Sequence, residues 1–423
     1  MENIKQIAPK KSSIKGKSGG NTYYVKSIFV VILFLVMIVI EVGNGRSYHD
    51  EVIGVVSAVY LIFFRNRIEK RDMITIITLA VVVAIGLVSN LVSNLTSSLF
   101  SIGIDVVAIT KLIFGFFALK YFLSDKEKQA TINMLLPLSK LYTLASFVCS
   151  IISLFADIGM SGEERYGIPA FRFIFFHSHQ YVAVYMLVFG VLVCNTKMTD
   201  KERRFYYTLA IISLVLATKA PPIMFSVIFI GLSYYFKDHE RVSPGIVILG
   251  AILIIALGWY QIENYLLRDD VPRHIFFEYS FKTANHYFPL GSGFSTYGSD
   301  QAARNYSKLY YQYGFDKMYG MTPDEGMFLS DNFWAMAIGQ FGWIGSIIYI
   351  GVFVRIFMTF SNKKYNNQRK AFLYAAYLQY MIHAVGSAIL SSSAGLIGFM
   401  ALAMFTVSDN DTHKRKSRLK IHF

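Results

Sequence analysis

The sequence predicts an all-α polytopic membrane protein. Three observations lead to this fold class: 54% of the 423 residues are hydrophobic and only 16% are charged, the mean hydropathy is +0.43, and the apolar residues occur in long runs. A soluble domain usually has about a quarter of its residues charged. A helical run of roughly 20 apolar residues is long enough to cross the hydrocarbon layer of a bilayer. The composition therefore excludes an ordinary soluble domain.

The apolar runs predict about 12 transmembrane helices. In chain order they lie near residues 25–42, 47–64, 73–94, 99–123, 130–155, 173–195, 205–218, 220–236, 244–262, 332–358, 371–389 and 393–408. The first run follows a basic segment, as the apolar part of a signal peptide would. It lacks an A-x-A-like cleavage site and many similar runs follow it, so we expect it to be a retained helix.

The distribution of basic residues predicts how these helices are oriented. With the N-terminus in the cytoplasm, the seven cytoplasmic segments contain 27 of the 41 lysines and arginines. This alternation follows the positive-inside rule, and it also places the C-terminus in the cytoplasm. The net charge of +14 is therefore explained by orientation and by contact with anionic lipids, and it does not indicate a nucleic-acid partner.

The chain divides into one membrane domain and two tails. We expect residues 1–22 to be a disordered basic cytoplasmic tail, residues 23–408 the helical domain, and residues 409–423 a second basic cytoplasmic tail. The sequence has no soluble domain and no internal repeat. Cys149 and Cys194 both lie within apolar runs, so they indicate neither a disulfide framework nor a zinc site.

One connection, residues 263–330 between helices 9 and 10, is far longer than the others, and long connections are usually functional or disordered. Its composition argues against disorder, since it has 16 aromatic residues among 68, with six basic and eight acidic residues. We expect a long extracytoplasmic loop that folds into a cap of two short helices.

Local signals predict where the two cap helices lie. Asp269–Asp270 followed by Pro272 is typical of a helix start, which predicts a helix over 273–288. Ser299–Asp300 predicts the cap of a second helix over 301–313. In that second helix three tyrosines would share one face: Tyr306, Tyr310 and Tyr313.

Polar side chains at the outer ends of four segments are the candidate functional residues. They are Arg165, Arg172, His177 and His179 near the sixth helix, Lys219 between the seventh and eighth, Arg273 in the cap, and Asp331 with Asn332 before the tenth. By the predicted topology, all four groups face away from the cytosol.

Each candidate also has a purely structural interpretation. An arginine near a helix end often extends to the lipid headgroups, Lys219 fits a plain turn, and Asp331 fits an N-cap favoured by the helix dipole. The aromatic residues of the cap fit an interfacial belt. His177 and His179, two residues apart, would face different ways on a helix, which is poor metal-binding geometry. We therefore expect no metal site and no cofactor.

Together, the outer polar residues suit a substrate that bears both phosphate and sugar. Guanidinium groups bind phosphate oxygens in bidentate fashion, and there is no acidic cluster for a metal ion. A tyrosine-rich surface suits the C–H faces of pyranose rings. This combination favours a lipid-linked glycan as the substrate.

Several segments resemble O-antigen polymerases and ligases. RHIFFEYSFKTANHYFPLGSGF (273–294) is similar to their Arg…Pro-x-Gly-x-Gly stretch. DNFWAMAIGQFGWIG (331–345) is similar to their later H-N-x9-G-x-x-G motif, with Asn332, Gly342 and Gly345 in place. RFIFFHSHQY (172–181) resembles their first outer arginine segment, and Lys219 stands where a basic residue often ends the next outer turn. The similarity covers roughly residues 165–350.

The resemblance implies a Wzy-type polysaccharide polymerase of the bacterial cytoplasmic membrane. Such an enzyme joins a glycan carried on undecaprenyl pyrophosphate to a hydroxyl of the next lipid-linked repeat unit. Arg172 and Arg273, helped by Lys219, would neutralise charge on the departing pyrophosphate, and Asp331 would orient or deprotonate the acceptor hydroxyl. Implied substrate-binding residues are Lys219, Arg165, His177, His179 and Asn332. The implied partners are lipid-linked oligosaccharides and membrane lipids, and a chain-length regulator is a further candidate.

One position departs from the motif. Asp331 stands where many relatives, ligases especially, have histidine, so the role of that histidine does not transfer unchanged. A carboxylate can still accept a proton or orient a sugar hydroxyl.

Three other interpretations stay open. A ligase of the same fold would pass finished glycan to another acceptor. A flippase for lipid-linked oligosaccharides would need ionisable residues near the bilayer midplane, where the sequence offers few: Asp105, Lys111, Lys140 and Arg355. The third interpretation is a purely structural membrane protein. The larger number of polar residues at the outer face favours the polymerase.

Overall fold

The structure, a computed structural model, describes most of the chain. The described residues are 19–43, 48–96, 98–165, 167–239, 271–361 and 365–408, with the isolated positions 243, 245, 259, 263 and 268. The predicted ninth helix (244–262), the tail at 409–423 and the Asp269–Asp270 helix start lie outside them. Most of the predicted N-terminal tail also lies outside them, and the first described helix begins at Gly19.

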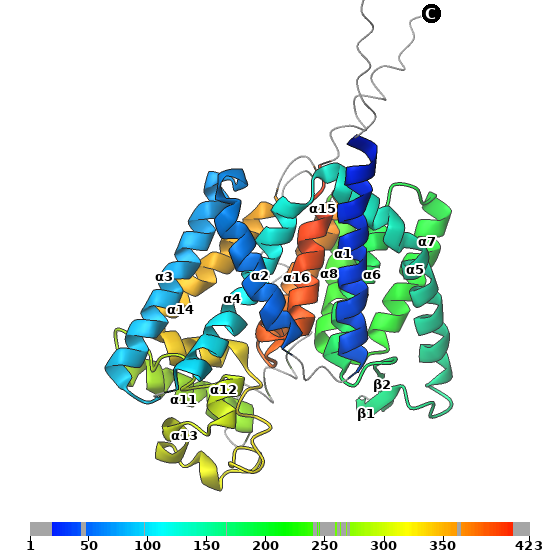
Figure 1. The fold of residues 1–423 in the computed structure, drawn as a ribbon. Coiled ribbons are helices and arrows are strands. Elements are labelled where there is room, and N and C mark those ends of the chain that lie inside the picture. The colour runs from blue at the N-terminus through cyan, green and yellow to red at the C-terminus, as the bar shows by residue number, and fades with distance from the viewer. Residues whose placement is uncertain are drawn as a thin grey trace, which may run out of the picture.

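A helix overlaps each predicted span that lies within the described residues (Figure 1). They are α1 (Gly19–Val42), α2 (His49–Phe63), α3 (Lys70–Ser93), α4 (Leu99–Phe122), α5 (Asp125–Ile152), α6 (Ser178–Cys194), α7 (Asp200–Val215), α8 (Ala220–Tyr235), α14 (Phe333–Thr359), α15 (Asn367–His383) and α16 (Ser393–Phe405). Short 3-10 helices are η1 (Arg65–Arg67), η3 (Phe315–Lys317) and η4 (Ile389–Ser391). In the described part, five helices are long and apolar enough to cross a membrane: α1, α3, α4, α5 and α14. The protein is therefore mainly helical, with several candidate spans.

A small sheet departs from the predicted all-α class. β1 (Ser161–Arg165) and β2 (Ile168–Phe171) form an antiparallel hairpin, with Arg165 opposite Ile168. The turn between them includes Gly167, whose φ of +74° suits the tight two-residue turns that match strand twist. After the hairpin, residues 173–177, predicted to begin the sixth span, form turns and bends, and α6 begins only at Ser178.

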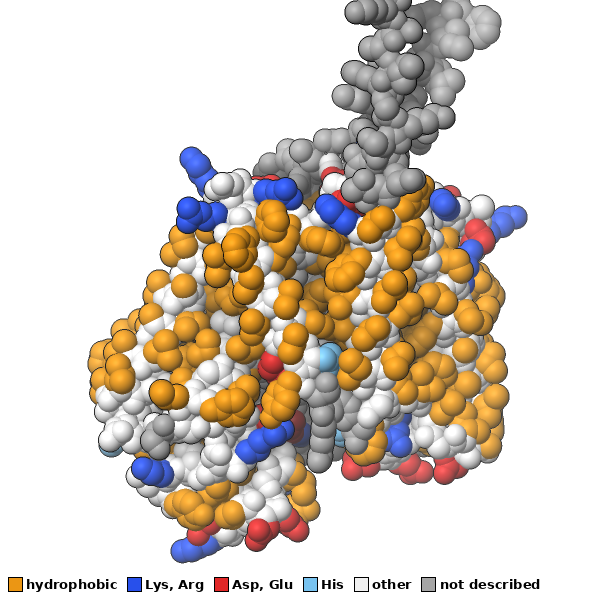
Figure 2. Space-filling model, in the orientation of Figure 1, with side chains coloured by type: hydrophobic (Ala, Val, Ile, Leu, Met, Phe, Trp, Pro, Cys, Tyr) orange, Lys and Arg blue, Asp and Glu red, His pale blue; other side chains and the backbone are white. Residues whose placement is uncertain are grey.

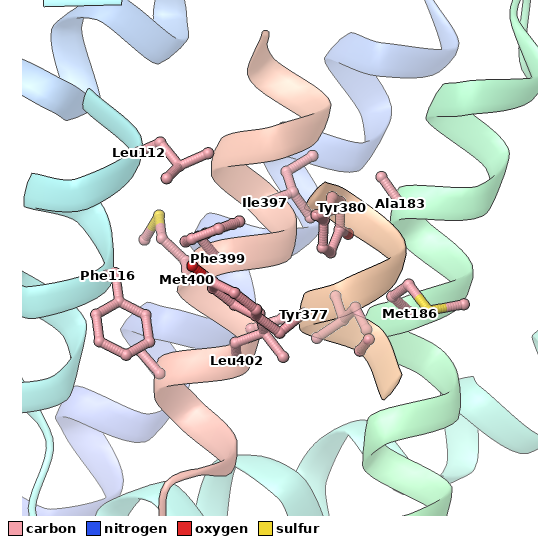
Figure 3. Packing of buried hydrophobic residues seen from close by; sticks show 14 of the residues in the cluster. Leu112, Phe116, Ala183, Met186, Tyr377, Tyr380, Ile397, Phe399, Met400 and Leu402 are labelled. Carbon is pink, nitrogen blue, oxygen red and sulfur yellow. The ribbon is translucent and has the colours of Figure 1, made fainter. Parts of the chain in front are cut away.

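The core of the bundle is built around α6 and α16. From Ala394 to Phe405 every residue of α16 is buried, and so is every residue of α6 from Gln180 to Cys194. A helix that is apolar all round belongs in the interior. Figure 3 shows side chains of α4, α6, α15 and α16 packing together: Leu112, Phe116, Ala183, Met186, Tyr377, Tyr380, Ile397, Phe399, Met400 and Leu402.

The outer helices expose apolar side chains along their flanks. Large hydrophobic residues of α1, α2, α3 and α5 are exposed, and hydrophobic side chains cover the sides of the bundle in Figure 2. Apolar surface of this extent is unusual on a soluble monomer. It indicates a multi-pass membrane protein whose flanks face lipid.

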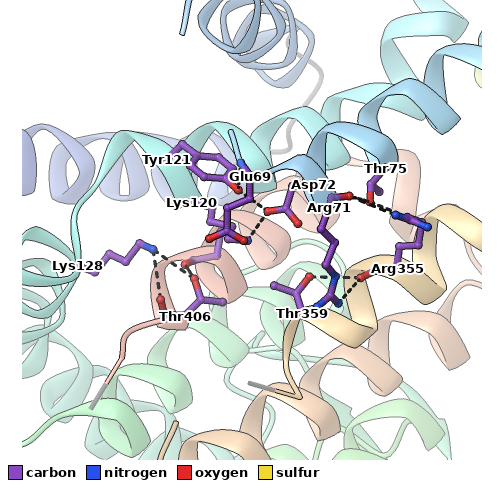
Figure 4. A network of polar contacts seen from close by, with 11 residues as sticks. Glu69, Arg71, Asp72, Thr75, Lys120, Tyr121, Lys128, Arg355, Thr359 and Thr406 are labelled. Atoms are coloured by element: carbon purple, nitrogen blue, oxygen red, sulfur yellow. Dashed lines mark hydrogen bonds and ion pairs between the residues drawn. The ribbon is translucent and has the colours of Figure 1, made fainter. Parts of the chain in front are cut away.

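The two ends of the bundle differ. The hairpin and the cap helices lie at one end in Figure 1. At the other end, where Lys and Arg side chains gather in Figure 2, buried polar contacts join neighbouring helix ends (Figure 4). There Lys120 pairs with Asp72, which also accepts a hydrogen bond from Tyr121 Oη at 2.6 Å. Lys128 donates to the carbonyl and hydroxyl oxygens of Thr406, each at 3.3 Å.

The cap is a folded unit with its own buried cluster. It contains α11 (Pro272–His286), α12 (Asp300–Arg304) and α13 (Lys308–Gln312), packed around residues such as Phe276, Tyr297 and Phe315. Ser299 caps α12 as predicted, since its hydroxyl accepts from Ala302 N at 3.1 Å. The single helix predicted over 301–313 is wrong, because a non-helical segment separates α12 from α13.

The cap tyrosines also have a different role from the one predicted. Tyr310 is fully buried, and its hydroxyl accepts from Gly298 N at 2.9 Å. Tyr306 donates to Met321 O at 3.0 Å, and the Tyr313 hydroxyl is 2.8 Å from Thr283 Oγ1. These contacts hold the cap together, and the buried Tyr310 is not available to stack on a sugar ring.

Candidate functional site

An ion pair joins the cap to the start of α14. Pro272 occupies the first turn of α11, where its missing N–H costs nothing, and Arg273 follows it. Arg273 donates from Nε to Asp331 Oδ2 at 3.0 Å, and its Nη2 contacts the same oxygen. The guanidinium also lies over the Phe328 ring, 5.9 Å from its centroid. The two sequence-predicted residues are therefore direct partners, although 58 positions separate them.

Contacts between α11 and α14 set the position of this ion pair. Trp343 Nε1 donates to Asn285 Oδ1 at 2.8 Å. The Trp343 ring also stacks on Phe281, with centroids 5.5 Å apart. Because α11 is held along α14, its first turn lies next to the residues that precede α14.

The predicted capping role of Asp331 is wrong. The N-cap of α14 is Asn332, whose side chain accepts from Ala335 N at 3.4 Å. Asp331 stands one residue earlier and turns to Arg273 instead. Among the described residues, no donor bonds Asp331 Oδ1, and the buried Asn332 Nδ2 has no acceptor. Buried donors are normally satisfied, so these atoms suit a polar ligand.

Burial controls the acidity of Asp331. It raises the pKa of the carboxyl above its ordinary value, and the opposing positive charges of Arg273, Lys219 and His177 only partly offset that effect. Loss of solvation disfavours the charged form, whereas a nearby cation favours it. Asp331 therefore accepts a proton more readily than an exposed aspartate would.

The hairpin positions Arg172 directly after β2. Phe171 N donates to Leu216 O at 3.1 Å and Arg172 N to Met160 O at 2.9 Å, which holds this strand against the end of α7. Arg172 Nη1 donates to Phe176 O at 2.6 Å. Its Nε is buried with no acceptor among the described residues. The backbone of Arg165 closes the hairpin, but its side chain lies outside the described part of the structure.

His177 is the point where the predicted groups meet. It is the N-cap residue of α6, with extended backbone, and its N–H donates to Gln180 Oε1 at 2.9 Å. Three charges act on its imidazole, those of Lys219, Arg172 and Asp331. Lys219 itself is the N-cap residue of α8. Residues from four separate segments are thus close enough to interact electrostatically.

His179 lies on the inner side of this group. Because His177 precedes the helix, the two rings do not diverge as expected but stack, with centroids 5.1 Å apart and planes 14° apart. The next ring is His383 at the end of α15, 6.4 Å from His179. Within the described residues no group of three or more His, Cys, Asp or Glu side chains is arranged to hold a metal ion.

Sequence reasoning missed two residues beside this site. His383 is buried at the end of an apolar helix, and only the packing of α15 shows that it is near His179. Glu41, also buried, accepts from Gln180 Nε2 at 2.8 Å and from the Ser393 hydroxyl. A carboxylate near the C-terminal end of the first apolar run is unusual in a membrane helix, and that signal could have identified it.

The ionisable residues considered for a flippase all have polar partners in the described part of the structure. Asp105 accepts from Ser295 N at 2.7 Å and so anchors the cap. Lys140 pairs with Glu202 at 3.0 Å. Arg355, near the opposite end, donates to Thr75 Oγ1 at 3.1 Å, and Lys111 pairs with α2. Each has a separate local partner.

No family model matches this sequence, and a search of curated proteins finds no significant match.

Proposed function

We propose that this protein is a polysaccharide polymerase. In this proposal it joins undecaprenyl-pyrophosphate-linked oligosaccharide repeat units at the outer face of the bacterial cytoplasmic membrane. About 12 membrane-spanning helices would place both termini in the cytoplasm and the cap outside. The partners would be lipid-linked oligosaccharides, membrane lipids and a chain-length regulator.

One observation carries the proposal: Arg273 binds Asp331 directly, Lys219 acts electrostatically on both Asp331 and His177, and Arg172 acts on His177, at the end of the bundle that bears the cap. Arg273 and Lys219 beside one carboxylate, with Arg172 beside the neighbouring His177, suit a pyrophosphate leaving group next to a hydroxyl acceptor. The buried Nε of Arg172 and Nδ2 of Asn332, each without an acceptor in the described part, supply donors for such a ligand.

The geometry supports a division of labour among these groups. Arg273 holds Asp331 Oδ2, which leaves Oδ1 to accept the proton of the acceptor hydroxyl. That hydroxyl oxygen attacks the anomeric carbon, and the bond from this carbon to the pyrophosphate oxygen breaks. Its electron pair goes to the pyrophosphate, whose charge Arg172 and Lys219 stabilise. One such preorganised donor contributes roughly 3–4 kcal/mol to the transition state.

The test is polymer length in cells that carry variants in place of the natural gene. We expect Asp331→Asn and Arg172→Ala each to lower polymer formation at least about 100-fold, with single repeat units accumulating on the outer leaflet. Arg273→Ala should lose polymer, whereas Arg273→Lys should retain part of it, since lysine keeps the positive charge but cannot form the bidentate hydrogen bonds of a guanidinium.

Matched controls separate chemistry from insertion. Lys282→Ala, on the same helix as Arg273 (α11), removes a half-exposed ion pair with Glu278. Asp324→Asn changes an exposed carboxylate of the cap. Both should give normal polymer and normal protein levels in the membrane. Long polymer from Arg273→Ala or Asp331→Asn would exclude the mechanism, and repeat units trapped on the inner leaflet would indicate a flippase instead.

A further inference from the structure

A polar cavity of about 670 Å³ lies between the cap and the bundle. Its walls come from the start of α2, the middle of α4, the start of α12 and the segment before α16. Binding pockets for small ligands commonly range from about 300 to 1,000 Å³, so one or two sugar rings would fit. In Figure 2, acidic and basic side chains are visible together next to the cap.

The cavity reaches the segment that precedes α14. Ser330, which precedes Asp331, is part of its lining, and so is Ala388 from the loop after α15. That loop contacts the start of α14, because Phe333 N donates to Ser387 O at 3.4 Å. A ligand in the cavity would therefore lie beside Ser330, the residue that precedes the proposed base in the chain.

A buried ion group forms one wall. Lys111 donates to Glu51 Oε1 at 2.8 Å and also contacts Asp50, and the Lys111 side chain is only 2% exposed. Buried ionic groups cost desolvation energy that a merely structural role rarely requires. Around the whole cavity, carboxylates outnumber cations four to two: Asp50, Glu51, Asp105 and Asp300 against Lys111 and Arg304.

We infer that this cavity binds sugar rings of a lipid-linked glycan and excludes sugars that bear a carboxylate. The inference rests on the proposed function and deepens it by naming the substrate class. Carboxylates accept hydrogen bonds from sugar hydroxyls, and serine hydroxyls both accept and donate them. An acidic sugar would meet the excess of negative charge at close range, where like charges repel strongly. The preferred repeat unit is thus neutral or basic.

Sugar binding can be measured on the purified full-length protein in detergent by saturation-transfer NMR. The probes are glucose, galactose, N-acetylglucosamine and glucuronic acid at pH 7. We expect signal from at least one neutral sugar and at least ten-fold weaker binding of glucuronic acid. The double variant Glu51→Gln, Asp300→Asn should reduce that discrimination, because it removes two of the four negative charges.

Two variants fill the cavity from different walls. Ala108→Phe on α4 and Ala388→Phe in the loop before α16 should each abolish the neutral-sugar signal and shorten the polymer. The matched control is Gly103→Phe at an exposed position of α4, where an added Cβ meets no atom within 4 Å. It should bind sugar and polymerise normally. Thermal unfolding in detergent identifies any variant that is merely misfolded. If one of the two variants misfolds, the variant on the other wall provides the test.

The outcomes distinguish this inference from the proposed function. Sugar signal that persists in both filled variants, or glucuronic acid that binds as well as galactose, would overturn the cavity assignment and leave the polymerase proposal intact. Sugar signal that only the filled variants lose, together with long polymer from Arg273→Ala, would support the cavity and overturn the polymerase mechanism.

Discussion

Asp331 is an acid whose environment makes it a better base than an ordinary aspartate. Burial raises the pKa of its carboxyl, and the nearby cations only partly oppose the shift. The hydrogen bonds from Arg273 reach one carboxylate oxygen and leave the other available. A base whose pKa lies closer to the working pH transfers protons more efficiently.

This environment predicts how activity depends on pH. The rate should fall as the pH decreases through the raised pKa of Asp331, because the protonated carboxyl can no longer accept the acceptor's proton. Its ion pair with Arg273 is lost over the same range. The acidic limb should therefore lie above pH 4, the ordinary range of an aspartate. Purified protein with lipid-linked repeat units provides the assay.

A substitution at Lys219 provides an independent test of the acidic limb of the pH–rate profile. Its positive charge lowers the pKa of Asp331, so Lys219→Met should shift the acidic limb of the residual activity to higher pH. The matched variant Lys317→Met changes an exposed lysine of the cap and should leave the profile unchanged. A limb that lies at pH 4, or one that Lys219→Met does not move, would remove Asp331 from the proton transfer.

At the scale of elements, the cap is fixed by a break in α14. Gly342 has φ 64° and ψ −169°, which interrupts the helix. The break leaves nearby carbonyls without their regular partners four residues on. Ser292 N donates to Gly339 O and Gly293 N to Gln340 O, both at 2.9 Å. The glycine-rich cap turn thus supplies the hydrogen bonds that the helix lacks.

This close backbone contact predicts a strong effect of one added methyl group. In Gly291→Ala the new Cβ would lie 2.3 Å from Gln340 O and 2.4 Å from Gly342 N. Neither backbone atom can move cheaply, so we expect a loss of unfolding free energy near or above the upper end of about 1–3 kcal/mol for overpacking. Thermal unfolding in detergent should show a lower midpoint.

The control for this variant lies on α14, the helix whose backbone Gly291 contacts. An added Cβ at Gly351 meets nothing within 4 Å, and alanine is a better helix former than glycine by roughly 0.5–1 kcal/mol. Gly351→Ala should therefore unfold at the same temperature or slightly higher. If Gly291→Ala unfolds at the natural temperature, the turn is not packed on α14 as described.

Sequence reasoning located elements better than the contacts between them. Apolar runs predict membrane helices because hydrocarbon tolerates no unpaired backbone, and polar residues at their ends indicate the outer site. Asp331 and Asn332 are both good N-caps, and only the path of the chain decides that Asn332 takes that role. Likewise, composition could not distinguish the buried, hydrogen-bonded Tyr310 from a surface tyrosine.

At the scale of the whole molecule, the separation of its two ends is the essential feature. The cap and the hairpin occupy one end, and the basic loops with the Lys120–Asp72 pair occupy the other. A polymerase of lipid-linked units needs this polarity, because its substrate and its product are both on the outer leaflet. Basic loops stay preferentially on the cytoplasmic side.

Cysteine labelling tests this polarity directly. In a background with Cys149 and Cys194 replaced by alanine, single cysteines are introduced at exposed positions of each end. Lys317→Cys in the cap should react with a membrane-impermeant maleimide in intact cells. Lys126→Cys at the start of α5 should react only after the membrane is permeabilised.

Two further positions make the labelling result decisive. Glu164→Cys in the hairpin should behave like the cap position, and Lys237→Cys after α8 like the α5 position; both side chains are exposed. Agreement within each pair shows that an even number of crossings separates its two positions. Opposite labelling of Lys237→Cys and Lys317→Cys shows that an odd number of crossings lies between α8 and the cap, as proposed. If the hairpin and the cap label from opposite sides, Arg172 and Asp331 cannot share a pocket, and the proposed catalytic group no longer exists.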